Sequence, residues 1–277
     1  MSERFMCFPG GKKKAVTLSY DDGIEADKKL IDWLEQYGVK GTFNLIPGWF
    51  AEDGKQYPEE ETYCLVSEKK ALEIYSSAQV EVSNHGDTHT YMTTISTAEM
   101  AGETLSCRKK LEALFGRNIR GMAYPYGWYS GELKEVLKMC GIAYCRTVNS
   151  TKAFELPGDW LEWHPTCHHD DPDLMRLTEE FVEMQAKDYP KLFYLWGHTF
   201  EFERNHNWEV IESFLKEISG KEDIWYATNM EIYEYVTAWK RLDISADGRR
   251  FVNPSKIPVW IQIDGVVYCI EDELVLE

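Results

Sequence analysis

Hydrophobic positions along the first 240 residues follow two alternating patterns. Short runs rich in β-branched and aromatic residues, typical of buried strands, are followed by segments with apolar residues three and four apart, typical of amphipathic helices. The predicted strands span residues 15–20, 41–46, 80–84, 120–124, 142–146, 192–196 and 224–227. The predicted helices span residues 25–37, 67–76, 96–115, 130–140, 172–187, 208–218 and 231–239.

Repeated alternation of strand and helix indicates a parallel sheet. About seven such units favour an α/β fold of the irregular (β/α) barrel type over an open sheet. After Lys240 the helices stop, and short apolar runs predict strands at 249–252, 257–263, 266–270 and 274–276. Asp264-Gly265 is a strong hairpin signal between two of these strands. We therefore expect a barrel over residues 1–240 and a small C-terminal β appendage over residues 241–277.

The composition and net charge of the chain indicate which kinds of partner to exclude. Forty-seven acidic residues oppose 30 basic ones, a formal net charge of -17. Such a surface repels phosphate backbones and anionic lipid, so we expect no nucleic-acid and no membrane partner. Seven scattered cysteines without a Cys-x-x-Cys pair predict reduced thiols, and residues 1–14 lack the apolar stretch of a signal peptide. We therefore expect a cytoplasmic protein; its oligomeric state stays open.

Residues able to do chemistry follow three of the predicted strands. In (β/α) barrels, the loops that leave the carboxyl ends of strands build the active site. Asp21 and Asp22 end the first strand, and two adjacent carboxylates are costly unless a cation or proton separates their roles. Alternatively, they form an acidic cap of the next helix. His85 and His89 end the third strand and have the i, i+4 spacing that suits one metal, or they are structural imidazoles; His198 follows a late apolar strand.

Together these residues form a consistent set. One carboxylate with two histidines makes a three-ligand metal site with open positions. A second carboxylate beside it suits a general base, and a distant histidine suits a general acid. This is the inventory of metal-assisted hydrolysis of an acyl bond.

The order of these motifs resembles that of the polysaccharide deacetylases, carbohydrate esterase family 4 (the NodB-homology domain), over about residues 14–240. Ser19-Tyr20-Asp21-Asp22-Gly23 looks like the family's Thr-Phe-Asp-Asp-Gly. His85 to His89 is similar to its His-Ser/Thr-x-x-His. Tyr124-Pro125-Tyr126-Gly127 looks like the end of its Arg-x-Pro-Tyr-Gly, and His198 looks like the catalytic histidine of its last motif.

The resemblance implies a role for each matching residue. Asp21 would be the base, His198 the acid, and the backbone N–H of Tyr126 an oxyanion donor. One divalent ion, expected to be zinc although cobalt, nickel and manganese also suit these ligands, would be held by Asp22, His85 and His89. The residues expected to bind substrate are Tyr124, Pro125, Trp163, Trp196 and His168.

Three positions depart from the family pattern. Gly86 stands where a Ser or Thr braces the histidine loop. Ala123 stands where an Arg steers the base, and Arg120 is three residues away. Trp196 stands where a Leu lines the pocket for the acetyl methyl group, so we expect a smaller or reshaped pocket.

The family's fourth motif, an Asp and a Trp, has several candidates in the irregular stretch before residue 172. They are Asp159, Trp160 and Trp163, and the sequence does not choose among them. The same stretch contains His164 and the run His168-His169-Asp170-Asp171. This run is either a polar loop or a wall of the cleft that brings His168 or His169 near the metal.

We therefore expect a metal-dependent hydrolase that removes N- or O-acetyl groups from an acetylated oligosaccharide or small glycoside and releases acetate. The loops 47–66 and 160–171 and Trp196 favour a pocket closed at one or both ends, for short soluble substrates. One alternative is a non-catalytic carbohydrate-binding barrel, with Ala123 as a mark of lost activity. A non-haem iron oxygenase using His85-Gly86-Asp87 is less consistent, because such enzymes usually have all-β folds.

Overall fold

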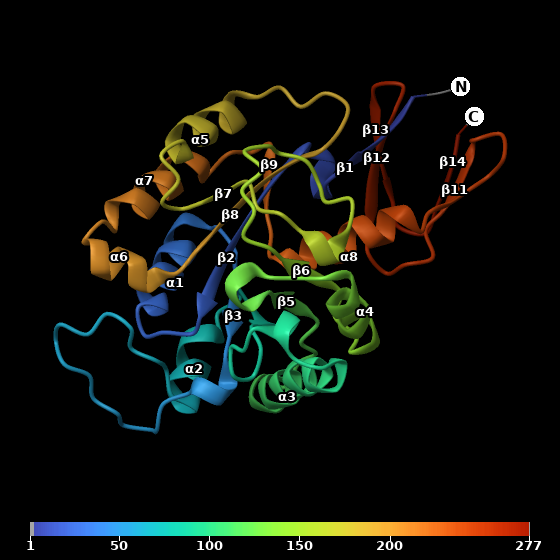
Figure 1. The fold of residues 1–277 in the computed structure, drawn as a ribbon. Helices are drawn as coiled ribbons and strands as arrows, with labels where there is room; N and C mark the ends of the chain where they lie inside the picture. Colours follow the sequence, from blue (N-terminus) through green and yellow to red (C-terminus); the bar gives the residue numbers. More distant parts are fainter. Residues whose placement is uncertain (1–2, 277) are drawn as a thin grey trace.

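The computed structural model describes residues 3–276, which form a curled half-barrel with two small antiparallel sheets (Figure 1). The half-barrel strands run in the order β6-β5-β4-β3-β2-β8-β7, all parallel, and β9 pairs with the first residues of β2. Their bounds are β2 (Lys14–Asp22), β3 (Gly41–Leu45), β4 (Val80–Asn84), β5 (Gly121–Ala123), β6 (Tyr144–Arg146), β7 (Cys167–His168), β8 (Lys191–Gly197) and β9 (Ile224–Tyr226). The predicted α/β barrel of parallel strands is confirmed.

Helices connect and cover these strands. They are α1 (Asp27–Tyr37), α2 (Glu68–Tyr75), α3 (Thr97–Phe115), α4 (Gly131–Met139), α5 (Leu174–Glu183), α6 (Thr199–Asn205), α7 (Glu209–Ile218) and α8 (Asn229–Lys240). Local signals explain several ends: Ser96 and Glu99 form a capping box before α3, and Gly116 ends it in the left-handed region at φ 64°. Within residues 3–276, no helix combines the length and apolar character needed to cross a membrane.

β2 is the centre of the half-barrel, and all nine of its residues are buried. It pairs with β3 on one side and β8 on the other, so that Asp21 lies opposite Asn44, and Tyr20 lies opposite Gly197. β3 pairs in turn with β4, and because these strands are all parallel, their carboxyl ends meet at one edge. The residues that follow β2, β4 and β8 in the sequence are brought together there.

The two small sheets are built from both ends of the chain. One contains β1 (Arg4–Cys7), β12 (Val259–Ile263) and β13 (Val266–Ile270), and the other contains β10 (Asp243–Ile244), β11 (Arg250–Val252) and β14 (Glu273–Val275). Asp264 and Gly265 have φ values of 47° and 84° in the turn of the predicted hairpin. The sequence did not predict β1, which lies beside β12 in Figure 1. The division of the chain at residue 240 stays a prediction, and its outermost residues 1–2 and 277 lie outside the described residues.

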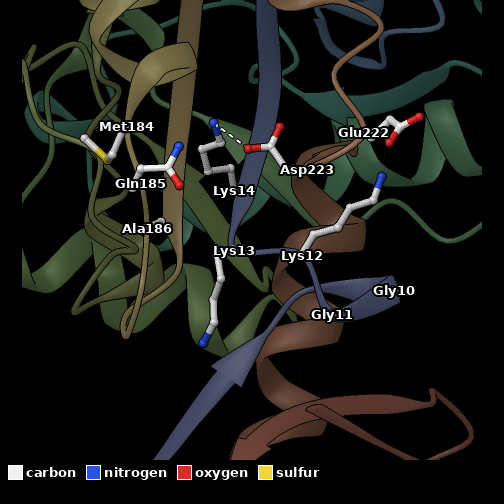
Figure 2. A pocket seen from close by; sticks show the side chains of 10 residues that line it. All are labelled: Gly10, Gly11, Lys12, Lys13, Lys14, Met184, Gln185, Ala186, Glu222 and Asp223. Atoms are coloured by element: carbon white, nitrogen blue, oxygen red, sulfur yellow. Dashed lines mark ion pairs between the residues drawn. The ribbon is translucent and has the colours of Figure 1, made fainter. Parts of the chain in front are cut away.

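A cavity of about 390 Å³ lies at the amino end of β2, away from the two aspartates at its carboxyl end. Figure 2 shows Lys12, Lys13 and Lys14 lining it. The buried Lys14 ammonium pairs with Asp223 at 2.7 Å. It also donates to the backbone carbonyls of Phe181 and Val182 in α5. This ammonium therefore has partners within the chain, and the cavity is separate from the predicted site.

Candidate active site

Asp21 and Asp22 end β2 and are both buried. Adjacent side chains in a regular strand point to opposite faces. Asp22 breaks this alternation, because its φ of 83° lies in the left-handed region, and Gly23 follows at φ 76°. As a result both carboxylates approach the same ring: His85 Nε2 lies 3.7 Å from Asp21 Oδ2 and 3.7 Å from Asp22 Oδ1.

His85 and His89 lie on the loop after β4. His85 Nδ1 is 2.9 Å from the carbonyl oxygen of Ala123, so this nitrogen donates its proton there and Nε2 keeps a lone pair directed at the aspartates. The two imidazole rings are 4.8 Å apart, and His89 Nε2 lies 4.0 Å from Asp22 Oδ1. The structure therefore brings the three predicted metal ligands together.

The donor set fits a divalent metal. Asp22, His85 and His89 each offer one ligand atom, and all these atoms lie within 4.8 Å of one another. Within the described chain, the buried Asp22 Oδ1 and His89 Nδ1 have no hydrogen-bond partner. A buried carboxylate oxygen without a donor is costly unless a cation compensates it. Two imidazoles and one carboxylate suit zinc and related divalent ions.

The loop that carries these histidines is braced from α3. Glu103 accepts hydrogen bonds from the amides of Asp87 and Thr88, at 3.0 and 2.9 Å, and from the Thr88 hydroxyl. Gly86 has φ 77°, a conformation that other residues rarely adopt. Glu103 thus supplies the support expected from a Ser or Thr at position 86.

Asp21 is held by one side chain from the neighbouring strand β3 and by one from β6, four strands away in the half-barrel. Arg146 Nη2 binds its Oδ2, and Asn44 donates to its Oδ1 at 2.8 Å. Although burial opposes ionisation, the positive charges of Arg146 and His198 and the hydrogen bond from Arg146 lower the pKa of Asp21 to about 2. Asp21 is therefore an anion at physiological pH, able to accept a proton.

The family pattern places an arginine at position 123 of β5. In this chain Arg146 of the neighbouring strand β6 binds the base instead. In the β5–β6 ladder, Ala123 and Arg146 are direct partners. Arg146 is 1% exposed, and its guanidinium lies 4.4 Å from the ring centre of Trp196. Arg120, the nearest arginine in sequence, is exposed and its Nε is 3.4 Å from the Gly141 carbonyl oxygen instead.

His198 lies between two carboxylates. Its Nε2 is 3.8 Å from Asp21 Oδ2, and its Nδ1 is 3.2 Å from Glu201 Oε2. Burial lowers the pKa of His198, but the bond to Glu201 and the charges of Asp21 and Asp22 outweigh it and raise the pKa to about 9. His198 is therefore protonated at neutral pH, as a general acid requires. Its Nε2 faces the side of the site where Asp21 lies.

A buried carboxyl group connects the turn after Asp22 with the turn after His198. Asp27 accepts hydrogen bonds from the Ile24 amide at 3.3 Å, the Tyr75 hydroxyl at 2.6 Å and the Thr199 hydroxyl. Burial raises the pKa of Asp27 to about 7, against the opposing effect of these donors. Asp27 thus fixes the relative positions of the two turns.

Exposed aromatic rings border the predicted metal ligands. Tyr126 has φ 59°, its ring lies 4.4 Å from that of His89, and it stacks on Tyr91 at 3.7 Å. Both tyrosines are more than 40% exposed. Such rings offer a flat surface for a sugar.

The residues expected to bind substrate do not all reach the site. Trp196 makes an edge-to-face contact with the ring of His168 at 4.5 Å and lies beside Arg146. Pro125 is buried beside the histidine loop, within 3.4 Å of a Cβ built at Gly86. Tyr124 and Trp163 require correction: both are 1% exposed and belong to the core, which leaves their side chains no surface for a sugar.

The candidates for the fourth motif lie away from the reacting groups. Asp159 accepts from the Leu161 amide at 2.9 Å and pairs with Lys134 at 3.0 Å. Trp160 packs edge-on against Trp163. The carboxylate that faces His198 is Glu201, from α6.

The sequence analysis did not predict four of the residues that lie around the site. They are Asp27, Asn44, Arg146 and Glu201. Asn44 and Arg146 lie near or at the carboxyl ends of predicted strands, the same signal that indicated the aspartates. Glu201 lies three residues after His198 and forms the capping box of α6, a helix that the sequence did not predict.

The chain is similar to one family of known proteins. The family model for polysaccharide deacetylase matches residues 9–145, about half of the chain, and this part of the chain belongs to that family. No curated protein sequence matches the chain significantly.

Solved structures show the same fold at low sequence identity. A polysaccharide deacetylase described from Mycobacterium smegmatis has a TM-score of 0.58 and 16% identity, over 85% of this chain and 94% of that one. A family 4 carbohydrate esterase from Streptomyces lividans, in complex with acetate, has a TM-score of 0.51 and 15% identity, over 78% and 93%. A mutant family 4 pseudoenzyme of Bacillus anthracis with restored activity has a TM-score of 0.50 and 19% identity, over 83% and 70%.

Proposed function

We propose that this protein is a metal-dependent hydrolase that removes N- or O-acetyl groups from a carbohydrate and releases acetate. One observation carries the proposal: Asp21 Oδ2 lies 3.7 Å from His85 Nε2 and 3.8 Å from His198 Nε2. An anionic base, a predicted metal ligand and a protonated imidazole therefore face one small volume. This is the arrangement that acyl hydrolysis needs.

Each residue has a chemical role in the proposed reaction. Asp22, His85 and His89 would hold a divalent cation, for which zinc is the first candidate and cobalt, nickel and manganese are others. When bound, such an ion polarises the acetyl carbonyl and acidifies water. Asp21 removes a proton from the water molecule whose oxygen forms the new bond to the carbonyl carbon.

The remaining steps use the other side of the site. The backbone N–H of Tyr126 donates to the oxyanion. His198 Nε2 gives its proton to the departing nitrogen or oxygen as the carbon–nitrogen or carbon–oxygen bond breaks. Acetate and a free amino or hydroxyl group on the sugar result.

We further propose an acetylated oligosaccharide or small glycoside as the substrate, met in the cytoplasm. The Tyr91–Tyr126 stack supports a carbohydrate beside the predicted metal ligands. On the other side, Tyr63 from the long loop packs against Phe200 at 5.1 Å, and Phe200 packs against His198 at 5.3 Å. Tyr63 and Phe200 therefore form a wall of the site next to His198, the proposed acid. This wall favours short substrates.

The test is acetate release from acetylated xylo-, chito- and muro-oligosaccharides, with zinc, cobalt, nickel or manganese added. We expect release from at least one substrate with the wild type, and release at least ~10²-fold slower with Asp21→Asn. Sugar binding measured by calorimetry without any acetate release would refute the enzyme and indicate a non-catalytic barrel.

A further inference from the structure

A second cluster of metal-ligating side chains lies behind His198. His169 and Asp170 follow β7, and Glu201 lies in the first turn of α6. His169 Nε2 lies 3.2 Å from Glu201 Oε2 and 3.4 Å from Asp170 Oδ1. One imidazole nitrogen and two carboxylates therefore converge from two separate segments of the chain.

His169 is buried without a hydrogen-bond partner. Its exposure is 0%, and neither ring nitrogen makes an aligned hydrogen bond to any group within residues 3–276. The ring is held between Phe202, at 4.1 Å, and Tyr20, at 5.8 Å. A fully buried imidazole with no partner needs an explanation, and a bound ion is one.

The chain makes room for this ring at a specific position. A Cβ at Gly197 would lie 2.0 Å from His169 Nδ1, so only glycine at the end of β8 leaves space for the imidazole. Nδ1 therefore faces the backbone of β8, while Nε2 faces the two carboxylates. This fixed orientation directs a single nitrogen into the cluster.

The separations suit coordination. Donor atoms at about 2.0–2.2 Å from one ion in tetrahedral geometry are about 3.3–3.6 Å from each other. The 3.2 and 3.4 Å separations in the cluster are close to this range. The Asp170 side chain is 36% exposed, which gives an ion a path from solvent.

His168 plays a different part. Its Nδ1 accepts a hydrogen bond from the Asp170 amide at 3.1 Å, so the proton of the neutral ring is on Nε2. That nitrogen lies 3.2 Å from Glu201 Oε2. His168 belongs to the same group of side chains, but its Nδ1 accepts from the Asp170 amide and its Nε2 carries the proton, so neither nitrogen has a free lone pair for an ion.

We propose that His169 Nε2, Asp170 and Glu201 form a second binding site for a divalent cation, separate from the Asp22, His85 and His89 site. Two carboxylates balance the charge of the ion, and the mixed nitrogen and oxygen donors favour zinc or a related transition metal over calcium. Because Glu201 also binds His198 Nδ1, this ion would fix the carboxylate that orients the proposed acid. Supporting carboxylates of this kind are typical around metal sites.

The experiment counts metal per chain. The purified protein is loaded with Zn²⁺, desalted and measured by mass spectrometry of the elements, and Co²⁺ loading gives an absorption spectrum for each site. We expect two equivalents in the wild type, one in Asp170→Ala and one in His89→Ala. Asp171→Ala is the matched control, because it removes the neighbouring carboxylate, which pairs with Lys152 at 3.2 Å, and should keep two equivalents.

The variants separate this inference from the proposed function. One equivalent in the wild type that disappears in His89→Ala and persists in Asp170→Ala would overturn the second site. One equivalent that disappears only in Asp170→Ala would support the second site and contradict the predicted first one. Circular dichroism of each variant excludes loss of metal through unfolding, and Asp170 is exposed enough for its replacement to keep the fold.

Discussion

The guanidinium of Arg146 binds the carboxylate of Asp21, 125 positions earlier in the chain. Both side chains are buried. Arg146 ends β6 and lies directly opposite Ala123 of β5, where the resemblance implied an arginine. The charge partner of the proposed base therefore comes from β6, the strand next to the one on which the resemblance places an arginine.

Replacement of Arg146 tests this partnership. Arg146→Met should lower kcat at least ~10-fold, because Asp21 loses the partner that holds its carboxylate. It should also lower the free energy of unfolding by ~3 kcal/mol, since a buried charge is left without its partner. Steady-state kinetics and urea unfolding measure the two effects. Arg120→Met, the exposed control, should change neither; equal effects of the two substitutions would contradict the assignment.

The two aspartates should separate cleanly in function. Asp21→Asn should cost at least ~10² in kcat while metal affinity at the first site is retained, because general base catalysis contributes about that much. Asp22→Ala should lose that metal, since it removes a ligand. Calorimetric metal titration beside acetate-release kinetics measures both. The reverse pattern would show that the roles are exchanged.

Glu201 should set the alkaline limit of activity. The pKa of His198 is raised to about 9, against the effect of burial, by the bond to Glu201 and the charges of Asp21 and Asp22. Because the acid works only when protonated, kcat should fall as pH rises through this pKa. Glu201→Gln removes a negative charge beside Nδ1, so the fall should move to lower pH. Glu203→Gln on the same helix is the control, and an unmoved profile in Glu201→Gln would argue against His198 as the acid.

Asp27 should make stability depend on pH. Burial raises its folded-state pKa to about 7 from 3.8, so the folded protein retains a proton that the unfolded chain releases between these values. The stabilisation is complete below pH 3.8 and is lost as pH rises to about 7, a change of about 4 kcal/mol at ~1.4 kcal/mol per unit. Asp27→Asn lacks this titration. Urea unfolding at a series of pH values should show the wild type losing stability relative to Asp27→Asn across that interval, and parallel curves would disprove it.

Substrate length tests the proposed shape of the site. The wall that Tyr63 and Phe200 form beside His198 should favour a di- or trisaccharide over the matching polymer. Deacetylation rates are compared at equal acetyl concentration. Tyr63→Ala should reduce the preference for the short substrate, whereas Tyr189→Ala, an exposed tyrosine in contact with Phe5, should not. A clear preference of the wild type for the polymer would refute the idea.

The sequence by itself determined the fold class and the first members of the site. Periodicity predicted seven parallel strands, because a buried parallel strand has an almost continuous apolar run. The same strands gave Asp21, Asp22, His85, His89 and His198 a common location, since the carboxyl ends of parallel strands share one edge. Local patterns also predicted the hairpin at Asp264-Gly265, because its turn requires positive φ.

Only the tertiary structure decided which distant residues complete the site. Strand register across the half-barrel, which no local pattern encodes, places Arg146 rather than Arg120 at Asp21. Trp163 and Tyr124 pack in the core. The sequence could not predict this, because an aromatic residue suits both a core and a binding cleft. His169 approaches the Glu201 carboxylate because β7 lies next to β8 in the folded sheet. These contacts depend on neighbours far apart in the chain, and long-range packing alone sets them.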